Sequence, residues 1–174
     1  MKKLANEELN RKSVEEFKQA DKNPIVLVLD NIRSLNNVGS AFRTADAFLL
    51  EAVYLCGVTG TPPNPEIHKT ALGATETVSW KQYKTTLECI DDLKKTGYTI
   101  CSIEQAERST MLNDFARDKN KKYALVFGNE VYGVEQEVIN KSDNVIEVPQ
   151  FGSKHSLNVS VTIGIVCWEM VRKN

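Results

Sequence analysis

Residues 25–29 read IVLVL, and Asp30 follows them. An unbroken apolar run that ends at an acidic residue is typical of a strand buried on both faces. A second run of this kind, YALVF at 123–127, leads into a glycine-containing segment at 128–133. Strands buried on both faces occur in parallel sheets that helices cover on both sides. These two runs therefore predict an α/β fold.

The pattern around these runs extends the prediction. After the first run, apolar residues recur at helical spacing from Val38 onward and predict a helix. Asn36 or Asn37 is placed to cap it. Weaker patterns predict strands at 53–56, 77–80, 98–103 and 144–148, helices at 66–72, 85–96 and 135–140, and one helical turn at 110–115. Strands that alternate with helices predict a mostly parallel sheet with helices on both faces, in one domain over 24–174. A polar helix or arm over 1–23 precedes it.

The last segment, 156–172, contains the β-branched run LNVSVTIGIV. Propensity favours a strand, but the run is too long for an ordinary one. Its apolar residues form two stripes at helical spacing, one from Leu157 to Val171 and one from Val159 to Met170. We therefore expect a helix that is buried on two sides.

Composition excludes some classes of protein. The chain has 174 residues, with 22 Lys+Arg against 23 Asp+Glu and a formal net charge of -1. No run approaches the roughly 20 apolar residues of a membrane span, and the first residues lack the apolar core of a secretory signal. The overall charge also points away from nucleic acid. Locally, however, residues 115–122 carry four basic residues against one acidic residue, and such patches bind phosphates that a whole-chain sum hides.

Four cysteines occur at wide spacing, without a CxxC pair and among apolar neighbours. Zinc sites and disulfide frameworks use closer, paired cysteines. We expect buried free thiols, no metal, and a reducing compartment, the cytoplasm.

The segment NNVGSAFRTAD follows the first buried run. If Asn37 caps the helix, Arg43 lies over the bare Gly39 near the helix start, where a guanidinium and free N–H groups favour an anion. Arg43 as a solvent-facing residue beside an ordinary cap is the alternative.

The segment LVFGNEVYGV includes the second buried run. It is not a phosphate-binding loop, because Val134 and Glu135 stand where Lys and Ser or Thr are required, and no GxGxxG occurs. Glu130 either orients a substrate, hydrogen-bonds an arginine, or is a plain turn carboxylate.

The segment VPQFGSKHSLNVSVTIGI follows the strand at 144–148. Ser156 is placed to cap the last helix, with Asn158 in its first turn. His155 is either a general base or an exposed loop residue.

Together and in this order, NNVGSAFRTADAF, ALVFGNEVYGV and VPQFGSKHSLNVSVTIGIVCWE resemble the three motifs of the SpoU (TrmH-type) family of SPOUT RNA 2'-O-ribose methyltransferases. EIHKTALGATETV resembles the stretch between the first two motifs. The resemblance covers about residues 24–172. The family's second motif often has Gly where this chain has Val131, a poor residue for a turn that needs positive φ. Val131 fits if Gly133 takes that conformation.

The resemblance implies a C-terminal trefoil knot, an exception to unknotted topology. It also implies S-adenosyl-L-methionine as cofactor, an RNA substrate (tRNA or rRNA), and a homodimer formed through the last helix. The implied catalytic residues are Asn37, Arg43, Glu130, Ser156 and Asn158. The implied cofactor-binding residues are Phe127, Gly128, Asn129, Ile146, Val148, Pro149, Ser156 and Leu157. The basic residues expected to bind RNA are Arg33, Arg43, Lys69 and Lys154.

The implied reaction transfers a methyl group to a ribose 2'-hydroxyl. Arg43 is a poor proton acceptor, so we expect it to bind the adjacent phosphate and stabilise the developing alkoxide, with Asn37 and Glu130 holding it in place. A non-catalytic RNA-binding or assembly protein of the same fold is the main alternative. A base-nitrogen methyltransferase is a further one, although the first motif favours ribose. A nicotinamide-dependent oxidoreductase lacks its glycine fingerprint here.

Overall fold

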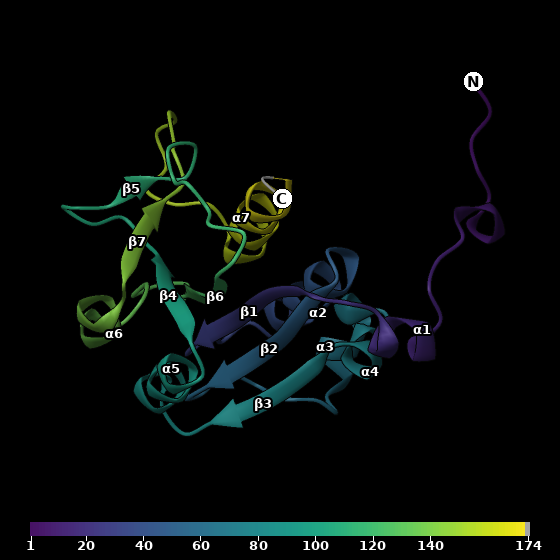
Figure 1. The fold of residues 1–174 in the computed structure, drawn as a ribbon, viewed down its shortest axis with the longest axis horizontal. Coiled ribbons are helices and arrows are strands. Elements are labelled where there is room, and N and C mark those ends of the chain that lie inside the picture. Colours follow the sequence, from purple (N-terminus) through teal and green to yellow (C-terminus); the bar gives the residue numbers. More distant parts are fainter. Residues whose placement is uncertain (173–174) are drawn as a thin grey trace.

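The computed structural model describes residues 1–172 and contains a seven-stranded sheet in the order β3-β2-β1-β6-β4-β7-β5 (Figure 1). The strands are β1 (Asn23–Asp30), β2 (Leu50–Cys56), β3 (Ser79–Tyr83), β4 (Tyr98–Ile103), β5 (Thr110–Met111), β6 (Lys122–Phe127) and β7 (Asn144–Glu147). Each pair of neighbouring strands is parallel. The predicted parallel sheet is confirmed, and the two apolar runs lie side by side at its centre as β1 and β6.

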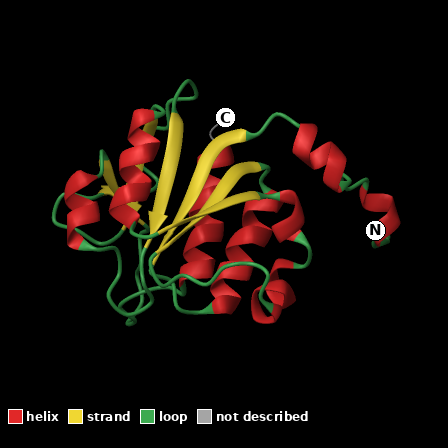
Figure 2. Ribbon diagram, turned by 90° about the horizontal axis from the view of Figure 1, so that it is seen from below, coloured by secondary structure: helices red, strands yellow, loops and turns green. Residues whose placement is uncertain are grey.

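Helices cover both faces of the sheet (Figure 2). The helices of the described residues are η1 (Asn6–Leu9), which lies away from the sheet, and α1 (Val14–Gln19), α2 (Leu35–Ala47), α3 (Pro65–Ala71), α4 (Ala74–Thr77), α5 (Thr86–Lys95), α6 (Gln136–Lys141) and α7 (Val159–Arg172). Alternate residues of β1 pack into two separate cores. Leu27 belongs to the core under α2 and α7, and Val28 to the core under α5 and α6. Both cores are fully buried along β1, which explains why its sequence is apolar without interruption.

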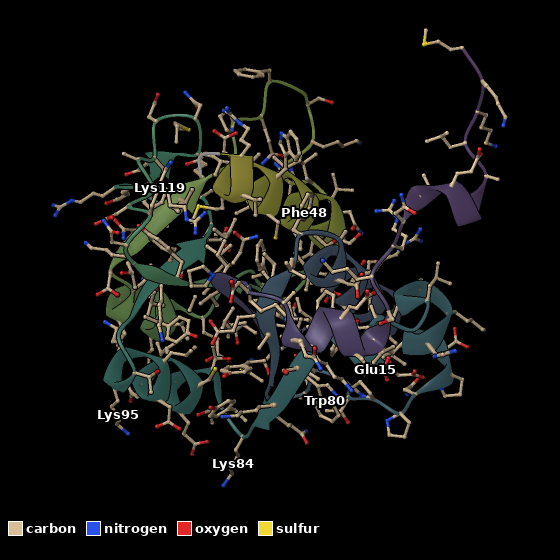
Figure 3. All side chains as sticks on the ribbon, turned by 45° about the vertical axis from the view of Figure 1, so that its right-hand side comes forward. Glu15, Phe48, Trp80, Lys84, Lys95 and Lys119 are labelled. Atoms are coloured by element: carbon tan, nitrogen blue, oxygen red, sulfur yellow. The ribbon has the colours of Figure 1, made fainter. Side chains whose placement is uncertain are left out.

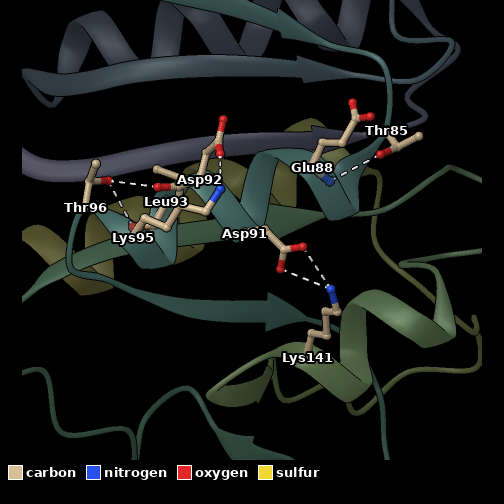
Figure 4. Close-up of polar contacts among 8 residues, drawn as sticks. All are labelled: Thr85, Glu88, Asp91, Asp92, Leu93, Lys95, Thr96 and Lys141. Carbon is tan, nitrogen blue, oxygen red and sulfur yellow. Dashed lines mark hydrogen bonds and ion pairs between the residues drawn. The ribbon is translucent and has the colours of Figure 1, made fainter.

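The second core lies beneath α5 and α6, which an ion pair also joins (Figure 4). Lys141 Nζ lies 3.1 and 3.0 Å from the two carboxylate oxygens of Asp91. Thr85 caps α5 by accepting a hydrogen bond of 3.2 Å from the Glu88 amide. The ion pair is half-exposed and therefore contributes little to the stability of the fold. Apolar packing in the second core is what holds α5 and α6 on the sheet.

The N-terminal segment extends away from the sheet, with Phe17 of α1 buried against the body (Figure 1). At the outer edge of the sheet, Trp80 of β3 is 37% exposed (Figure 3). No helix within residues 1–172 combines the length and apolar character that a membrane crossing requires.

Two local predictions, both of helix caps, are wrong. The cap of α2 is Ser34, whose hydroxyl accepts a hydrogen bond of 3.3 Å from the Asn37 amide, and not Asn36 or Asn37. Helix α7 begins at Val159, so Ser156 does not cap it. Asn158 instead accepts a hydrogen bond of 2.9 Å from the Ser160 amide. Ser and Asn are equally good caps, so composition cannot choose between neighbouring candidates.

The helical turn expected at 110–115 is confirmed in part. Thr110 and Met111 form the edge strand β5 beside β7. The turn follows directly, where the amides of Asp114 and Phe115 donate hydrogen bonds of 2.9 and 3.0 Å to the Met111 carbonyl. The Leu112 amide continues this pairing with a hydrogen bond of 2.8 Å to the Glu147 carbonyl. The pairing with β7 therefore makes residues 110–111 a strand and delays the start of the turn. The predicted trefoil knot stays a prediction, since strand order and pairing do not describe threading.

Candidate active site

The carboxyl ends of the adjacent strands β6 and β4 open into a cavity of about 490 Å³. It lies where three loops meet: the one after β4, the turn after β6, and the segment between β7 and α7. Its walls are formed by Ile103, Glu104, Gln105, Phe127, Gly128, Asn129, Glu130, Val131, Tyr132, Gly133, Val148, Gln150, His155, Ser156, Leu157, Asn158, Val159 and Thr162. In parallel α/β sheets, ligands bind outside the carboxyl ends of the strands, which is the position of this cavity.

The turn after β6 is held rigidly. Asn129 and Gly133 exchange two backbone hydrogen bonds of 3.0 and 2.9 Å. The Asn129 side chain donates to the Asn31 carbonyl at 2.7 Å and accepts from the Val131 amide at 2.9 Å. Gly133 has φ 70°, and Val131 is not among the residues with positive φ, so the expectation that Gly133 takes that conformation is confirmed.

Gly128 is required by close packing inside this turn. A Cβ at this position would lie 2.0 Å from the Gly133 carbonyl carbon and 2.1 Å from the Val134 nitrogen. Only glycine lets these backbone segments approach so closely. The glycine therefore shapes one wall of the cavity.

Glu130 connects this turn to the start of α2. Its carboxylate accepts hydrogen bonds of 3.0 Å from the backbone amides of Arg33 and Ser34. The side-chain amide of Asn37 donates a third, also of 3.0 Å, to the same oxygen as Ser34. Burial would raise the pKa of Glu130, but these three donors outweigh it and hold the pKa below 4.5. Glu130 is thus a structural carboxylate that remains ionised.

Asn37 extends the network to the last segment. It is 8% exposed, and its side-chain oxygen lies 3.4 Å from the donating side-chain nitrogen of Asn158. Asn158 directly precedes α7, so the starts of two helices and the turn after β6 are joined by side chains. The three segments singled out in the sequence therefore meet at one place.

Arg43 is not part of this network. It is exposed on α2, outside the walls of the cavity, and the described residues offer its guanidinium no hydrogen bond. The expectation that Arg43 covers a bare Gly39 is wrong, because Gly39 faces α3. A Cβ there would lie 2.1 Å from the hydroxyl of Thr70. Nor do Asn37 and Glu130 hold Arg43 within one chain, since they bind each other instead.

The other predicted site residues divide into three groups. Those in the walls of the cavity are Phe127, Gly128, Asn129, Val148, Ser156 and Leu157. Ile146, buried in β7, and Pro149 do not line it. Of the predicted RNA-binding residues, Arg33 and Lys154 are exposed, and Lys69 forms an ion pair of 2.6 Å with Glu66.

The sequence interpretation missed the loop after β4. The Glu104 carboxylate accepts hydrogen bonds of 2.9 Å from the Val134 and Gln105 amides. Gln105 donates a hydrogen bond of 3.0 Å to the carbonyl of His155 and so ties this loop to the segment before α7. The predicted strand at 98–103 was a usable signal, because its carboxyl end had to lie at the same edge as the other two. The described residues include no group of three or more His, Cys, Asp or Glu side chains that could hold a metal ion.

The fold and the cavity define an α/β protein with a ligand site at the carboxyl ends of adjacent parallel strands. Residues 24–168 match the SpoU rRNA Methylase family, and the chain belongs to that family. It is 32% identical to an uncharacterized tRNA/rRNA methyltransferase of Borreliella burgdorferi, over 92% of this chain and 68% of that protein. It is 31% identical to a 23S rRNA (guanosine-2'-O-)-methyltransferase of Neisseria meningitidis, over 86% of this chain. The chain spans only 58–59% of the length of some relatives, the Neisseria protein among them.

Solved structures show the same fold. The A. aeolicus TrmH/SpoU tRNA modifying enzyme superposes with a TM-score of 0.81 at 25% identity, over 92% of this chain and 80% of that one. An AdoMet-bound rRNA methyltransferase from Sinorhizobium meliloti superposes with a TM-score of 0.80 at 25% identity, over 93% of this chain and 61% of that one.

Proposed function

We propose that the protein is an S-adenosyl-L-methionine-dependent RNA methyltransferase that modifies a ribose 2'-hydroxyl of tRNA or rRNA. The observation that carries the proposal is the network of Asn37, Glu130 and Asn158, which joins the three characteristic segments beside one cavity. The activity named for the Neisseria relative and the AdoMet bound to the Sinorhizobium structure support it.

The cavity suits this cofactor in size and in lining. Its volume of about 490 Å³ lies in the range of small-molecule sites. The apolar side chains of Phe127, Val148 and Leu157 suit an adenine ring, and the polar Gln150 and Thr162 suit the amino-acid part. The cofactor would supply a methyl group already activated on a sulfonium. Threading of the last segment as a trefoil knot would hold these walls together, and it forms part of the proposal.

The residues of this chain then orient the reactants. Holding a hydroxyl in line with the methyl donor contributes up to about 7–11 kcal/mol. Glu130 and Asn37 fix the start of α2, including the backbone of Arg33, whose exposed basic side chain is then available to an RNA at the cavity. A guanidinium is a poor proton acceptor, so Arg43 would not act as the base; it would bind the neighbouring phosphate and stabilise the developing alkoxide.

A homodimer gives Arg43 a place to act. One stripe of α7 faces the core, and the other is exposed at Val161 (50%), Ile165 (39%) and Trp168 (58%). Exposed apolar side chains of this extent on one helix mark an interaction surface. Helix α7 packs against α2, which carries Arg43, so a second copy on this surface would receive Arg43 near its own cavity.

The RNA would bind through the exposed basic residues Arg33, Arg43, Lys69 and Lys154 around this edge of the sheet. The four cysteines are buried free thiols, which supports work in a reducing compartment, the cytoplasm.

Isothermal titration with S-adenosyl-L-methionine tests the proposal. We expect saturable binding, and competition by S-adenosylhomocysteine. No heat of binding to a folded protein of known oligomeric state would favour the alternative, a non-catalytic RNA-binding protein of this fold.

A further inference from the structure

Tyr132 is an aromatic side chain displayed at the mouth of the cavity with no use inside the fold. It lines the cavity, yet it is 85% exposed. Among the residues whose side chains the structure describes, none forms a ring contact or a side-chain hydrogen bond with it. Its neighbour Val131 is also exposed, at 71%. Leaving such apolar surface in water has a cost that binding of a partner would remove.

The backbone that carries Tyr132 is fixed in place. Its amide donates a hydrogen bond of 3.2 Å to the side-chain oxygen of Asn129, and the bridge between Asn129 and Gly133 closes the turn. Glu130 ties the same turn to the start of α2. Because the backbone of the turn is already ordered, covering the ring restricts only the two side-chain torsions of Tyr132.

Basic residues in the segments that line the cavity favour an anionic ligand. Arg33, whose amide binds Glu130, and Lys154, next to the cavity-lining His155, are both exposed. The two carboxylates in the walls, Glu104 and Glu130, accept hydrogen bonds from backbone amides and are thereby partly neutralised. An exposed aromatic side chain together with basic residues in the neighbouring segments is the usual composition of a site for single-stranded nucleic acid.

We infer that Tyr132 stacks on an unpaired nucleobase of the RNA substrate, and that the nucleotide to be methylated lies in a single-stranded loop, bulge or end. The inference rests on the proposed function. A base can cover the ring face only when it is free of its own neighbours, since bases in an A-form helix stay stacked. The basic side chains hold the adjoining phosphates, and the ring sets the position of the nucleoside at the mouth of the cavity.

The test uses the full-length protein and a short single-stranded oligoribonucleotide that contains 5-iodouridine. Irradiation should cross-link the RNA to Tyr132, as identified by mass spectrometry. Tyr132→Ala should weaken RNA binding about tenfold or more, equivalent to about 1.4 kcal/mol. Tyr132→Phe, which keeps the ring, should stay within about twofold of the wild type, because stacking does not need the hydroxyl.

Trp80→Ala is the matched control, because Trp80 is an exposed aromatic on the edge strand β3, which β2 and β1 separate from β6. Trp80→Ala should leave the affinity for the single-stranded RNA unchanged. With a fully paired duplex of the same sequence, the affinity should be the same for the wild type and for every variant. The affinity for S-adenosyl-L-methionine and the sedimentation behaviour should be the same for all variants.

Three results would overturn the inference. The first is an RNA affinity of Tyr132→Ala equal to that of the wild type. The second is a loss of cofactor affinity in Tyr132→Ala, which would mean that the ring stacks on the adenine of the cofactor. The third is a change in the oligomeric state of Tyr132→Ala, which would mean that a second copy buries the ring. A wild-type protein that methylates RNA while Tyr132→Ala binds it equally well refutes only the role of Tyr132. A wild-type protein that neither binds the cofactor nor modifies RNA refutes the proposed function.

Discussion

Replacement of Glu130 probes the network that joins the three segments of the site. The carboxylate accepts three hydrogen bonds, from the amides of Arg33 and Ser34 and from the Asn37 side chain. Hydrogen bonds to a charged group contribute about 1.5–3 kcal/mol each when buried. Glu130 is exposed, so in the variant water can make many of the hydrogen bonds that the carboxylate made. We therefore expect Glu130→Ala to destabilise the fold by about 1–2 kcal/mol.

Glu130→Gln should cost less, because of the geometry of the three bonds. Ser34 and Asn37 donate to one carboxylate oxygen and Arg33 to the other. A glutamine keeps the first two bonds when its carbonyl replaces the shared oxygen, but it places an NH₂ against the Arg33 amide. We expect a loss of about 0.5–1 kcal/mol. The assay is thermal unfolding by circular dichroism, where about 2–4 °C corresponds to 1 kcal/mol for a chain of this size.

The pH dependence gives a second readout. The pKa of Glu130 is below 4.5 in the folded protein, so its contribution to stability is present above pH 4.5 and is lost as the pH falls through the folded pKa. The stability gap between wild type and Glu130→Gln should therefore narrow below about pH 4.5. Glu107→Gln changes an exposed glutamate outside this network and should match the wild type throughout. Equal unfolding temperatures for wild type and Glu130→Ala would refute this account of the network.

Three further changes test separate parts of the structure. Gly128→Ala should lower the free energy of unfolding, measured in urea, by more than about 2 kcal/mol, because the new Cβ would meet the Gly133 backbone at 2.0 Å. Gly152→Ala should not lower it, because Gly152 has open space around it. Equal stabilities of the two variants would contradict the packing argument. Arg43→Lys should slow single-turnover methyl transfer at least about tenfold, because lysine cannot make a bidentate contact, while the affinity for RNA changes less. Near-normal turnover would show that the guanidinium is not needed. Trp168→Glu should convert a dimer to a monomer in sedimentation equilibrium, because Trp168 lies on the exposed stripe of α7. Trp80→Glu, on the edge strand β3, should leave the dimer intact. A Trp168→Glu protein that is still a dimer would place the interface elsewhere.

The elements that could be predicted are those with a strong local signal. The apolar runs at 25–29 and 123–127 became the central strands β1 and β6, because burial on both faces requires apolar residues at every position. The two stripes of the last segment likewise predicted α7, and the buried stripe faces the core through Ile163 and Met170.

The parts that could not be predicted depend on distant partners. The carboxylate of Glu130 binds backbone amides 96 and 97 positions earlier in the chain, and no residue type signals a backbone donor. Gly39 invited a ligand-binding interpretation, yet it is a glycine because α3 packs against it. The strand β5 forms only because β7 lies beside it. In each case the contact that decides is absent from the local pattern.

The most direct test of the central claim is the position of the transferred methyl group. The purified protein is incubated with unmodified tRNA and rRNA and with S-adenosyl-L-methionine labelled in its methyl group, and the RNA is then hydrolysed with alkali. A 2'-O-methyl group blocks cleavage of the adjoining phosphodiester, so we expect the label in alkali-resistant dinucleotides, and none with Arg43→Ala. Label in ordinary mononucleotides would show methylation of a base, and no label in any RNA would contradict the proposed activity.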